Sequence, residues 1–271
     1  MHFLNEPRRQ LVALHAEPEF RSKLRGLRNH DVEVRFVDTW EGLRQVAQEA
    51  SPATLLLVDP YHANGKKPEP TLHDLLRTFP SLVVLAAIPR DADMADVCTL
   101  GRWGVADVIQ IELEDTTRLL LRRLREVRAR PLNQLLHADF PGPLPGRARA
   151  ILETAVDVAL QGGLPRDMAD RMGMDGSTLR RWCALSQLPP PRKLLLWMRS
   201  LIASMLLDDP GHTIFSAALA CGYNSDQAMR RALQRSLPMT PSELREIGAF
   251  ETVASAFHQE VLRPPHREQL S

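Results

Sequence analysis

Short apolar runs alternate with helical patterns in the first half of the chain. Five runs are rich in branched aliphatic residues, as strands are: Leu11–Leu14, Val32–Val37, Leu55–Val58, Leu82–Leu85 and Val108–Ile111. Each is followed by a helical spacing of apolar residues, over Glu19–Leu27, Trp40–Glu49, Leu72–Phe79, Asp93–Arg102 and Thr116–Arg128. Strands that alternate with helices form a parallel sheet covered on both faces. The pattern therefore predicts an α/β domain with a five-stranded parallel sheet.

The second half of the chain shows helical patterns only. Its most apolar helix is expected from about Arg192 to Leu207, directly after Pro189–Pro191. Lys193 and Arg199 interrupt this apolar run, which is also too short to cross a bilayer. We therefore predict a buried helix that joins two smaller helical units.

One of these units is centred on Gly222. The small residues Ala217–Ala220 predict a helix that a second helix can approach closely, and Gly222 can adopt the positive φ of a sharp turn. Asn224 or Ser225 is expected to cap the next helix. The buried face of that helix carries Met229, Leu233 and Leu237. Thr240–Glu243 has the sequence of a capping box and predicts the start of another helix.

A similar unit occurs upstream, around Gly173. Ala169 precedes Gly173 by four residues, as Ala218 precedes Gly222. Asp175 is a candidate N-cap of the following helix. The repetition favours two helix-turn-helix units over a single accidental match.

Polar and basic residues lie on the expected outer face of the second helix in each unit. Arginine can donate two hydrogen bonds to guanine in the major groove, and glutamine can pair with adenine. The candidate DNA contacts are Ser177, Thr178, Arg180, Arg181, Ser225, Gln227, Arg230, Arg231, Gln234 and Arg235. Arg180, Gln227 and Arg230 are preferred, whereas Arg231 either contacts DNA or packs against a neighbouring helix. The alternative is a helical packing unit whose arginines are only solvated.

Two such units joined by a long helix resemble the DNA-binding domain of the AraC family of transcription regulators. The resemblance covers about 147–247, and Ala220–Tyr223, Arg231 and Met239–Arg245 carry it. It implies an all-α domain whose two recognition helices enter successive segments of the major groove. By this resemblance the recognition helices are about Ser177–Leu185 and Ser225–Ser236.

Three residues depart from the AraC pattern. Met229 and Leu233 stand where the family usually has aromatic residues, and Pro238 replaces a glycine at the end of the recognition helix. The net charge of the chain is only +1, so the basic character depends on where the arginines are placed. We expect a modest, salt-sensitive nonspecific affinity for DNA.

The first half of the chain resembles the receiver domain of bacterial response regulators over about 9–130. Pro52–Asp59 matches the strand that ends in the phosphoacceptor aspartate, and Gly104–Ile109 matches the segment entering the fifth strand. The resemblance implies a flavodoxin-like fold and makes Asp59 the candidate phosphoacceptor.

Most of the receiver's phosphorylation apparatus is replaced. His15 and Ala16 stand where receivers carry acids for Mg²⁺, Ala86 or Ala87 replaces the hydroxyl, and Ile111 replaces the lysine. Phosphoryl transfer depends on metal and cationic groups that stabilise the transferring phosphoryl. We therefore predict a pseudo-receiver without a metal site or conventional aspartate phosphorylation.

These resemblances predict a bacterial transcription regulator that binds double-stranded promoter DNA. The pseudo-receiver would form a homodimer or receive a signal from a partner, and RNA polymerase is a further candidate partner. The expected dimer face is the one that receivers commonly use, with Val97, Leu100, Trp103, Val108, Leu119 and Arg122. Two alternatives stay open: a response regulator controlled by phosphorylation of Asp59, and a protein-interaction scaffold that does not bind DNA.

The expected organisation is a receiver-like domain at 1–131, a linker at 132–146, the DNA-binding domain at 147–247, and a closing helix and tail at 248–271. Cys98, Cys183 and Cys221 have no Cys-x-x-Cys spacing and are expected to be buried thiols in a reducing compartment. The sequence shows no signal peptide, transmembrane helix, metal-ligand spacing or phosphate-binding loop. We therefore expect a non-enzymatic protein without a cofactor, located in the cytoplasm at the nucleoid.

Overall fold

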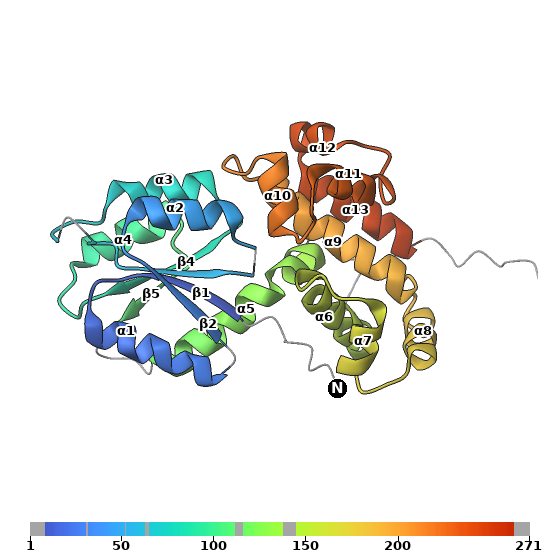
Figure 1. The fold of residues 1–271 in the computed structure, drawn as a ribbon, viewed down its shortest axis with the longest axis horizontal. Coiled ribbons are helices and arrows are strands. Elements are labelled where there is room, and N and C mark those ends of the chain that lie inside the picture. Colours follow the sequence, from blue (N-terminus) through green and yellow to red (C-terminus); the bar gives the residue numbers. More distant parts are fainter. Residues whose placement is uncertain are drawn as a thin grey trace, which may run out of the picture. The chain divides into compact units, whose positions relative to one another are not determined.

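The computed structural model describes residues 9–30, 32–51, 53–62, 65–111, 116–137 and 145–262 of the 271-residue chain. Its contacts divide the chain into two compact units. The first unit comprises Met1–Arg128 and Asp209–His212, and the second comprises Ala129–Asp208 and Thr213–Ser271. The first is α/β and the second is all-α, which confirms the predicted fold class (Figure 1). The Pro-Gly segment 141–144 of the expected linker and the expected tail at 264–271 lie outside the described residues.

A parallel sheet with the strand order β2-β1-β3-β4-β5 forms the centre of the first unit. The strands are β1 (Arg9–Leu14), β2 (Val32–Val37), β3 (Leu55–Val58), β4 (Val83–Ile88) and β5 (Asp107–Gln110). Leu14 at the end of β1 lies opposite Val58 at the end of β3, so these two strands end at the same edge. This order is that of a flavodoxin-like fold, in which the carboxyl ends of the strands form the site.

Helices cover both faces of this sheet (Figure 1). They are α1 (Pro18–Arg25), the 3₁₀ helix η1 (Gly26–His30), α2 (Trp40–Glu49), α3 (Pro70–Thr78), α4 (Met94–Trp103) and α5 (Thr116–His137). One apolar cluster joins the sheet to α2, α3 and α4, for example through Leu43, Leu72 and Leu100. A second cluster joins the opposite face to α1 and α5 through Phe20 and Leu124. All five of these side chains are fully buried, so each helix has one apolar face on the sheet.

The segment Asp209–His212 completes the first unit. The Asp209 carboxylate accepts hydrogen bonds from the backbone N–H of Ser81, at 2.9 Å, and from its hydroxyl group. The N–H of Gly211 donates to the carbonyl oxygen of Thr78 at 2.8 Å. A Cβ atom at position 211 would lie 2.3 Å from the ring of Phe79, so only glycine fits this approach.

Eight helices form the second unit's described fold around one long central helix. They are α6 (Gly146–Leu160), α7 (Pro165–Arg171), α8 (Gly176–Leu185), α9 (Pro191–Leu207), α10 (Ile214–Ala220), α11 (Asp226–Gln234), α12 (Pro241–Ile247) and α13 (Ala249–Leu262). Helix α9 contacts α6, α7, α8 and α10 to α13, and most of its side chains are buried. The apolar run after Pro191 is therefore a buried linking helix, as predicted. Within the described residues, no helix has the length and apolar character needed to cross a membrane.

Several local predictions need correction. Strand β4 begins at Val83 and continues to Ile88, whereas the prediction ended at Leu85 before two alanines that have little strand preference. Strand β5 begins at Asp107, and Ile111 follows it rather than ending it. Cys98 is exposed, not buried, because α4 buries only the face that carries Asp96 and Leu100.

Candidate nucleic-acid interface

The second helix-turn-helix unit is formed by α10, a turn at Gly222, and α11. Gly222 has φ 77°, in the left-handed region that other residues rarely adopt. The N–H of Tyr223 donates to the carbonyl oxygen of Ala218 at 2.9 Å and closes the turn. Ala217 and Ala218 are fully buried, so small side chains do occupy the place where the two helices approach each other.

Ser225, rather than Asn224, caps the recognition helix α11. Its hydroxyl oxygen accepts a hydrogen bond from the N–H of Ala228 at 3.1 Å. Met229 and Leu233 are buried in the domain core, as the spacing predicted. Leu237 lies beyond the end of α11 and is partly buried against the same core.

The first unit repeats this geometry with α7, a turn at Gly173, and α8. Gly173 has φ 64°, and the N–H of Met174 donates to the carbonyl oxygen of Ala169 at 3.0 Å. The alanine therefore stands four residues before the glycine in both units, and its carbonyl accepts the hydrogen bond that closes each turn. The two units are repeats in structure as well as in sequence.

Asp175 caps α8, and its carboxylate also accepts hydrogen bonds from the hydroxyl groups of Ser177 and Thr178. Its Oδ1 accepts from the N–H groups of Ser177 and Thr178 at 2.8 and 2.9 Å. The Ser177 hydroxyl donates to Oδ1 at 2.5 Å, and the Thr178 hydroxyl donates to Oδ2 at 2.8 Å. These hydrogen bonds, first that of the Ser177 hydroxyl, hold the pKa of Asp175 well below its usual range. The carboxylate is thus a fixed negative charge at the N-terminus of α8.

The remaining candidate contact residues lie on the outer faces of the two recognition helices and at the end of α11. Arg180, Arg181, Gln227, Arg231, Gln234 and Arg235 are exposed, and Arg230 and Ser225 are half-buried. Because Arg231 is exposed, it does not pack into the core as a structural residue. In the part of the chain that the structure describes, no hydrogen bond or ion pair engages the five arginines at these positions. Their guanidinium groups can therefore donate to an external acceptor.

Four further basic residues, which the sequence did not indicate as a group, gather at the start of α7 and the first half of α9. Arg166, Arg192, Lys193 and Arg199 line a cavity of about 900 Å³ together with Arg235. They come from the start of α7, the first half of α9 and the end of α11. Arg192 and Arg199 share one face of α9, but only the packing of α7 and α11 on α9 brings Arg166 and Arg235 to them.

The candidate phosphoacceptor Asp59 follows β3 and is half-buried. Its Oδ1 accepts from the N–H of Tyr61 at 2.9 Å, as an aspartate that terminates a strand does. Buried His15 lies at the end of β1, and its Nδ1 accepts from the N–H of Glu17 at 3.2 Å. Burial lowers the pKa of His15, although the charges of Asp59 and Glu17 oppose that shift. A neutral His15 offers no cationic stabilisation to a phosphoryl group on Asp59.

The other replaced receiver positions supply no hydroxyl group that could assist phosphoryl transfer to Asp59. Ala86 and Ala87 are fully buried within β4, where they offer no hydroxyl group. Lys67, in the segment before α3, forms an ion pair with Asp96 of α4, with Nζ 3.1 Å from Oδ1. Burial and then Asp96 raise the pKa of Tyr61, whose hydroxyl donates to Asp96, to about 12.

The expected dimer face is only partly a surface. Leu100 is fully buried in the core of the first unit and cannot contribute to a dimer contact, because the same face of α4 packs on the sheet. Trp103 is half-buried and stacks on His73 with ring centroids 5.3 Å apart. Val97, Val108 and Leu119 are half-buried, and Arg122 is exposed.

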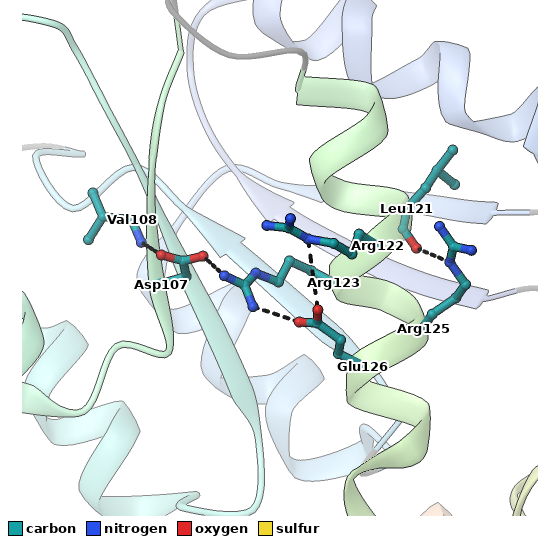
Figure 2. A network of polar contacts seen from close by, with 7 residues as sticks. All are labelled: Asp107, Val108, Leu121, Arg122, Arg123, Arg125 and Glu126. Atoms are coloured by element: carbon teal, nitrogen blue, oxygen red, sulfur yellow. Dashed lines mark hydrogen bonds and ion pairs between the residues drawn. The ribbon is translucent and has the colours of Figure 1, made fainter. Parts of the chain in front are cut away.

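Charged residues dominate the β5–α5 part of this face. Figure 2 shows Arg123 of α5 between Asp107 of β5 and Glu126 of α5. Arg122 lies 3.8 Å from the same Glu126 carboxylate. Burial opposes the charged form of Arg123, but its hydrogen bonds to Glu126 and Asp107 raise its pKa. This polar network is accessible to a partner and would have to be matched by polar groups.

Comparisons with known proteins identify the second unit's domain type. Residues 168–247 match the family model described as a helix-turn-helix domain. Among solved structures, full-length FixJ from B. japonicum is similar, with 13% identity, 85% of this chain and 98% of that chain covered, and a TM-score of 0.36. The response regulator StyR is also similar, with 15% identity, coverage of 69% and 96%, and a TM-score of 0.30. A comparison with curated protein sequences gave no match.

The matched residues contain both turn glycines and both recognition helices. Residues 168–247 thus form a helix-turn-helix domain. The first unit has the 2-1-3-4-5 parallel sheet and the second contains this helix-turn-helix domain.

Proposed function

We propose that this chain is a transcription regulator with an AraC-type domain in its C-terminal part. It would read a specific promoter sequence with α8 and α11 in successive major-groove segments. The observation that carries the proposal is the structural repeat. Each unit has a turn glycine with positive φ, and each presents an arginine pair on the helix after the turn. Two reading helices in one domain can contact two groove segments without a second protomer.

The contact residues divide by chemistry. Arg180, Gln227 and Arg230 are proposed to contact base edges, which decide the sequence, whereas Arg181 and Arg235 contact phosphates. Arg231 and Gln234 complete the surface of α11. The hydroxyl groups of Ser177 and Thr178 already donate their protons to Asp175. Their oxygen atoms can therefore only accept a hydrogen bond from a base. Ser225 contributes mainly by capping α11.

The first domain is proposed to set occupancy of DNA without conventional phosphorylation. The surroundings of Asp59 support this, because neutral His15 and the buried alanines of β4 replace the groups that assist phosphoryl transfer. A homodimer through the α4–β5–α5 face would place two reading domains on paired sites. The promoter-bound protein would then contact RNA polymerase. We place it in the cytoplasm and propose that it has no enzymatic activity. The proposed domain limits are 1–131 and 147–247.

The test is the sequence preference of the full-length chain. Selection of bound fragments from genomic DNA is expected to yield a common motif that spans two successive major-groove segments. Equal retention of all fragments, or retention of none, would contradict the proposal and favour the protein-interaction scaffold.

The pseudo-receiver is tested separately with acetyl phosphate and Mg²⁺. We expect no gain of a phosphoryl mass on the intact chain and no change in DNA affinity. A stoichiometric adduct that Asp59→Asn abolishes would instead show a response regulator controlled by phosphorylation.

A further inference from the structure

A cavity lined by the start of α7, the first half of α9 and Arg235 combines apolar and basic side chains. Its volume, about 900 Å³, is within the range that small-molecule sites occupy. The apolar residues that line it are Leu164, Pro165, Pro190, Leu195 and Leu196. The basic residues that line it are Arg166, Arg192, Lys193, Arg199 and Arg235. Among the described residues that form its wall, none is acidic.

These cations are only partly neutralised by the protein itself. Lys193 pairs with Glu260, with 2.5 Å between Nζ and Oε1, and Arg166 lies 3.7 Å from Asp167. Arg199 donates to the carbonyl oxygen of Gly163, which fixes its position but does not cancel its charge. In the described part of the chain, Arg192 and Arg235 have no ion pair. The described residues that line the cavity therefore leave it with net positive charge.

We propose that this cavity binds a small amphipathic anion, a carboxylate on a hydrocarbon body. Guanidinium groups pair with carboxylates through two parallel hydrogen bonds, which suits the arginines at the wall. The leucines and prolines that line the cavity require an apolar body, because a purely polar ion would leave them unmatched. A DNA backbone offers anionic groups but no hydrocarbon to match these leucines and prolines, so it is the weaker candidate for this cavity.

An anion here would oppose DNA binding, and this part of the inference rests on the proposed function. A neighbouring cavity of about 460 Å³ shares Arg166 and Arg192 with the first and extends to Asp175 and Arg180 of the α8 region. Arg235, a proposed phosphate contact, also lines the first cavity. Bound carboxylate would therefore occupy Arg235 and add negative charge next to α8. The ligand would lower the affinity for DNA.

The binding claim is tested by calorimetry on the full-length protein without DNA. Decanoate is compared with decanol, which has no charge, and with inorganic phosphate, which has no apolar body. Because a charge-assisted hydrogen bond contributes about 1.5–3 kcal/mol, decanoate is expected to bind at least about tenfold more tightly than either. No decanoate binding, or equal binding of decanol or phosphate, would overturn the proposal without any variant.

A pair of variants locates the site. Arg192→Gln with Arg199→Gln is expected to weaken decanoate binding at least about tenfold and to leave decanol binding unchanged. Arg149→Gln on α6 removes one positive charge outside the cavity and serves as the control. The Nε of Arg149 lies 2.9 Å from Oε1 of Glu153, so this arginine is already paired. An equal effect of the control, or no effect of the double variant, would place decanoate elsewhere.

The regulatory claim is tested by DNA affinity with and without decanoate. We expect at least a several-fold loss of affinity in the parent chain and a smaller loss in Arg192→Gln with Arg199→Gln. If the parent binds DNA but decanoate neither binds nor acts, the inference fails and the proposed function stands. If decanoate binds but no DNA does, the proposed function and the regulatory claim fail, while the binding site stands.

Discussion

The two helix-turn-helix units share a backbone but differ in electrostatics. In both, a glycine with positive φ follows an alanine by four residues, and the carbonyl of that alanine accepts the hydrogen bond that closes the turn. Their caps differ: Asp175 begins α8, whereas Ser225 begins α11. The Asp175 carboxylate accepts from the N–H groups of Ser177 and Thr178, whereas the Ser225 hydroxyl accepts only from that of Ala228. Only the ionised cap places a negative charge where DNA would approach.

Because of this difference, α8 and α11 have different side chains available for contact with DNA. Asp175 engages the hydroxyl groups of Ser177 and Thr178, so α8 depends on Arg180 and Arg181 for donors to DNA. Helix α11 keeps a broader set of free side chains on its outer face: Gln227, Arg230, Arg231 and Gln234. We therefore expect the second unit to contribute more to sequence discrimination, and the following variants test that asymmetry.

The largest expected effect comes from the arginines proposed to contact base edges. Arg230→Ala and Arg180→Ala should each weaken specific binding by about 1–3 kcal/mol and relax the preference at separate base pairs. Fluorescence anisotropy on matched and mutated sites measures both effects. Arg149→Ala on α6 is the control for charge. If Arg180→Ala changed discrimination more than Arg230→Ala, the proposed asymmetry would be wrong.

The turn glycines should respond alike. Gly173→Ala and Gly222→Ala should each lower the free energy of unfolding by about 1–2 kcal/mol, because L residues strain at positive φ. No atom lies within 4 Å of a Cβ at either position, so the backbone alone causes this cost. Chemical denaturation measures it, and asparagine should recover part of the loss.

Gly176 is the matched control for the turn glycines. It is in α8 without positive φ, and a Cβ there also meets no atom within 4 Å. Gly176→Ala should therefore stabilise the helix by about 0.5–1 kcal/mol. Destabilisation of all three variants to the same extent would show that crowding, not positive φ, decides.

Substitution of the N-cap residues should have a smaller effect, on stability for one cap and on DNA affinity for the other. Ser225→Ala should cost about 1 kcal/mol of stability, because the N–H of Ala228 loses its acceptor. Asp175→Asn keeps a good N-cap but removes the negative charge, so it should bind DNA more tightly with little change in stability. Calorimetric unfolding and DNA titrations separate the two outcomes. Weaker DNA binding by Asp175→Asn would show that the carboxylate positions Ser177 and Thr178 for contact.

The smallest effect is the pH dependence of the first cap. The pKa of Asp175 is lower in the folded chain than its ordinary value of 3.8, so its stabilising contribution is present above that value. It is lost as the pH falls through the folded pKa. The stability advantage of the parent over Asp175→Ala should therefore shrink from about pH 5 downwards. Unfolding at several pH values measures this, and Ser225→Ala should show no such dependence.

The repeated patterns predicted most of the fold. The five strand runs and the buried helix α9 could be read because each element has its own periodicity. Ends were less certain: Ala86 and Ala87 belong to β4 although they have little strand preference. Periodicity also shows which face of an element is buried but not what covers it. Leu100 was therefore expected on a surface that the sheet in fact covers.

The sequence by itself determined the two reading helices, because glycine, cap and apolar spacing are local signals within each unit. Tertiary structure decided which charges meet. Lys67 reaches Asp96 on α4, and Arg166, Arg199 and Arg235 surround one cavity although they come from three segments of the chain. Such groupings depend on how helices pack across long sequence separations, and no local pattern encodes a side chain's neighbour on another element.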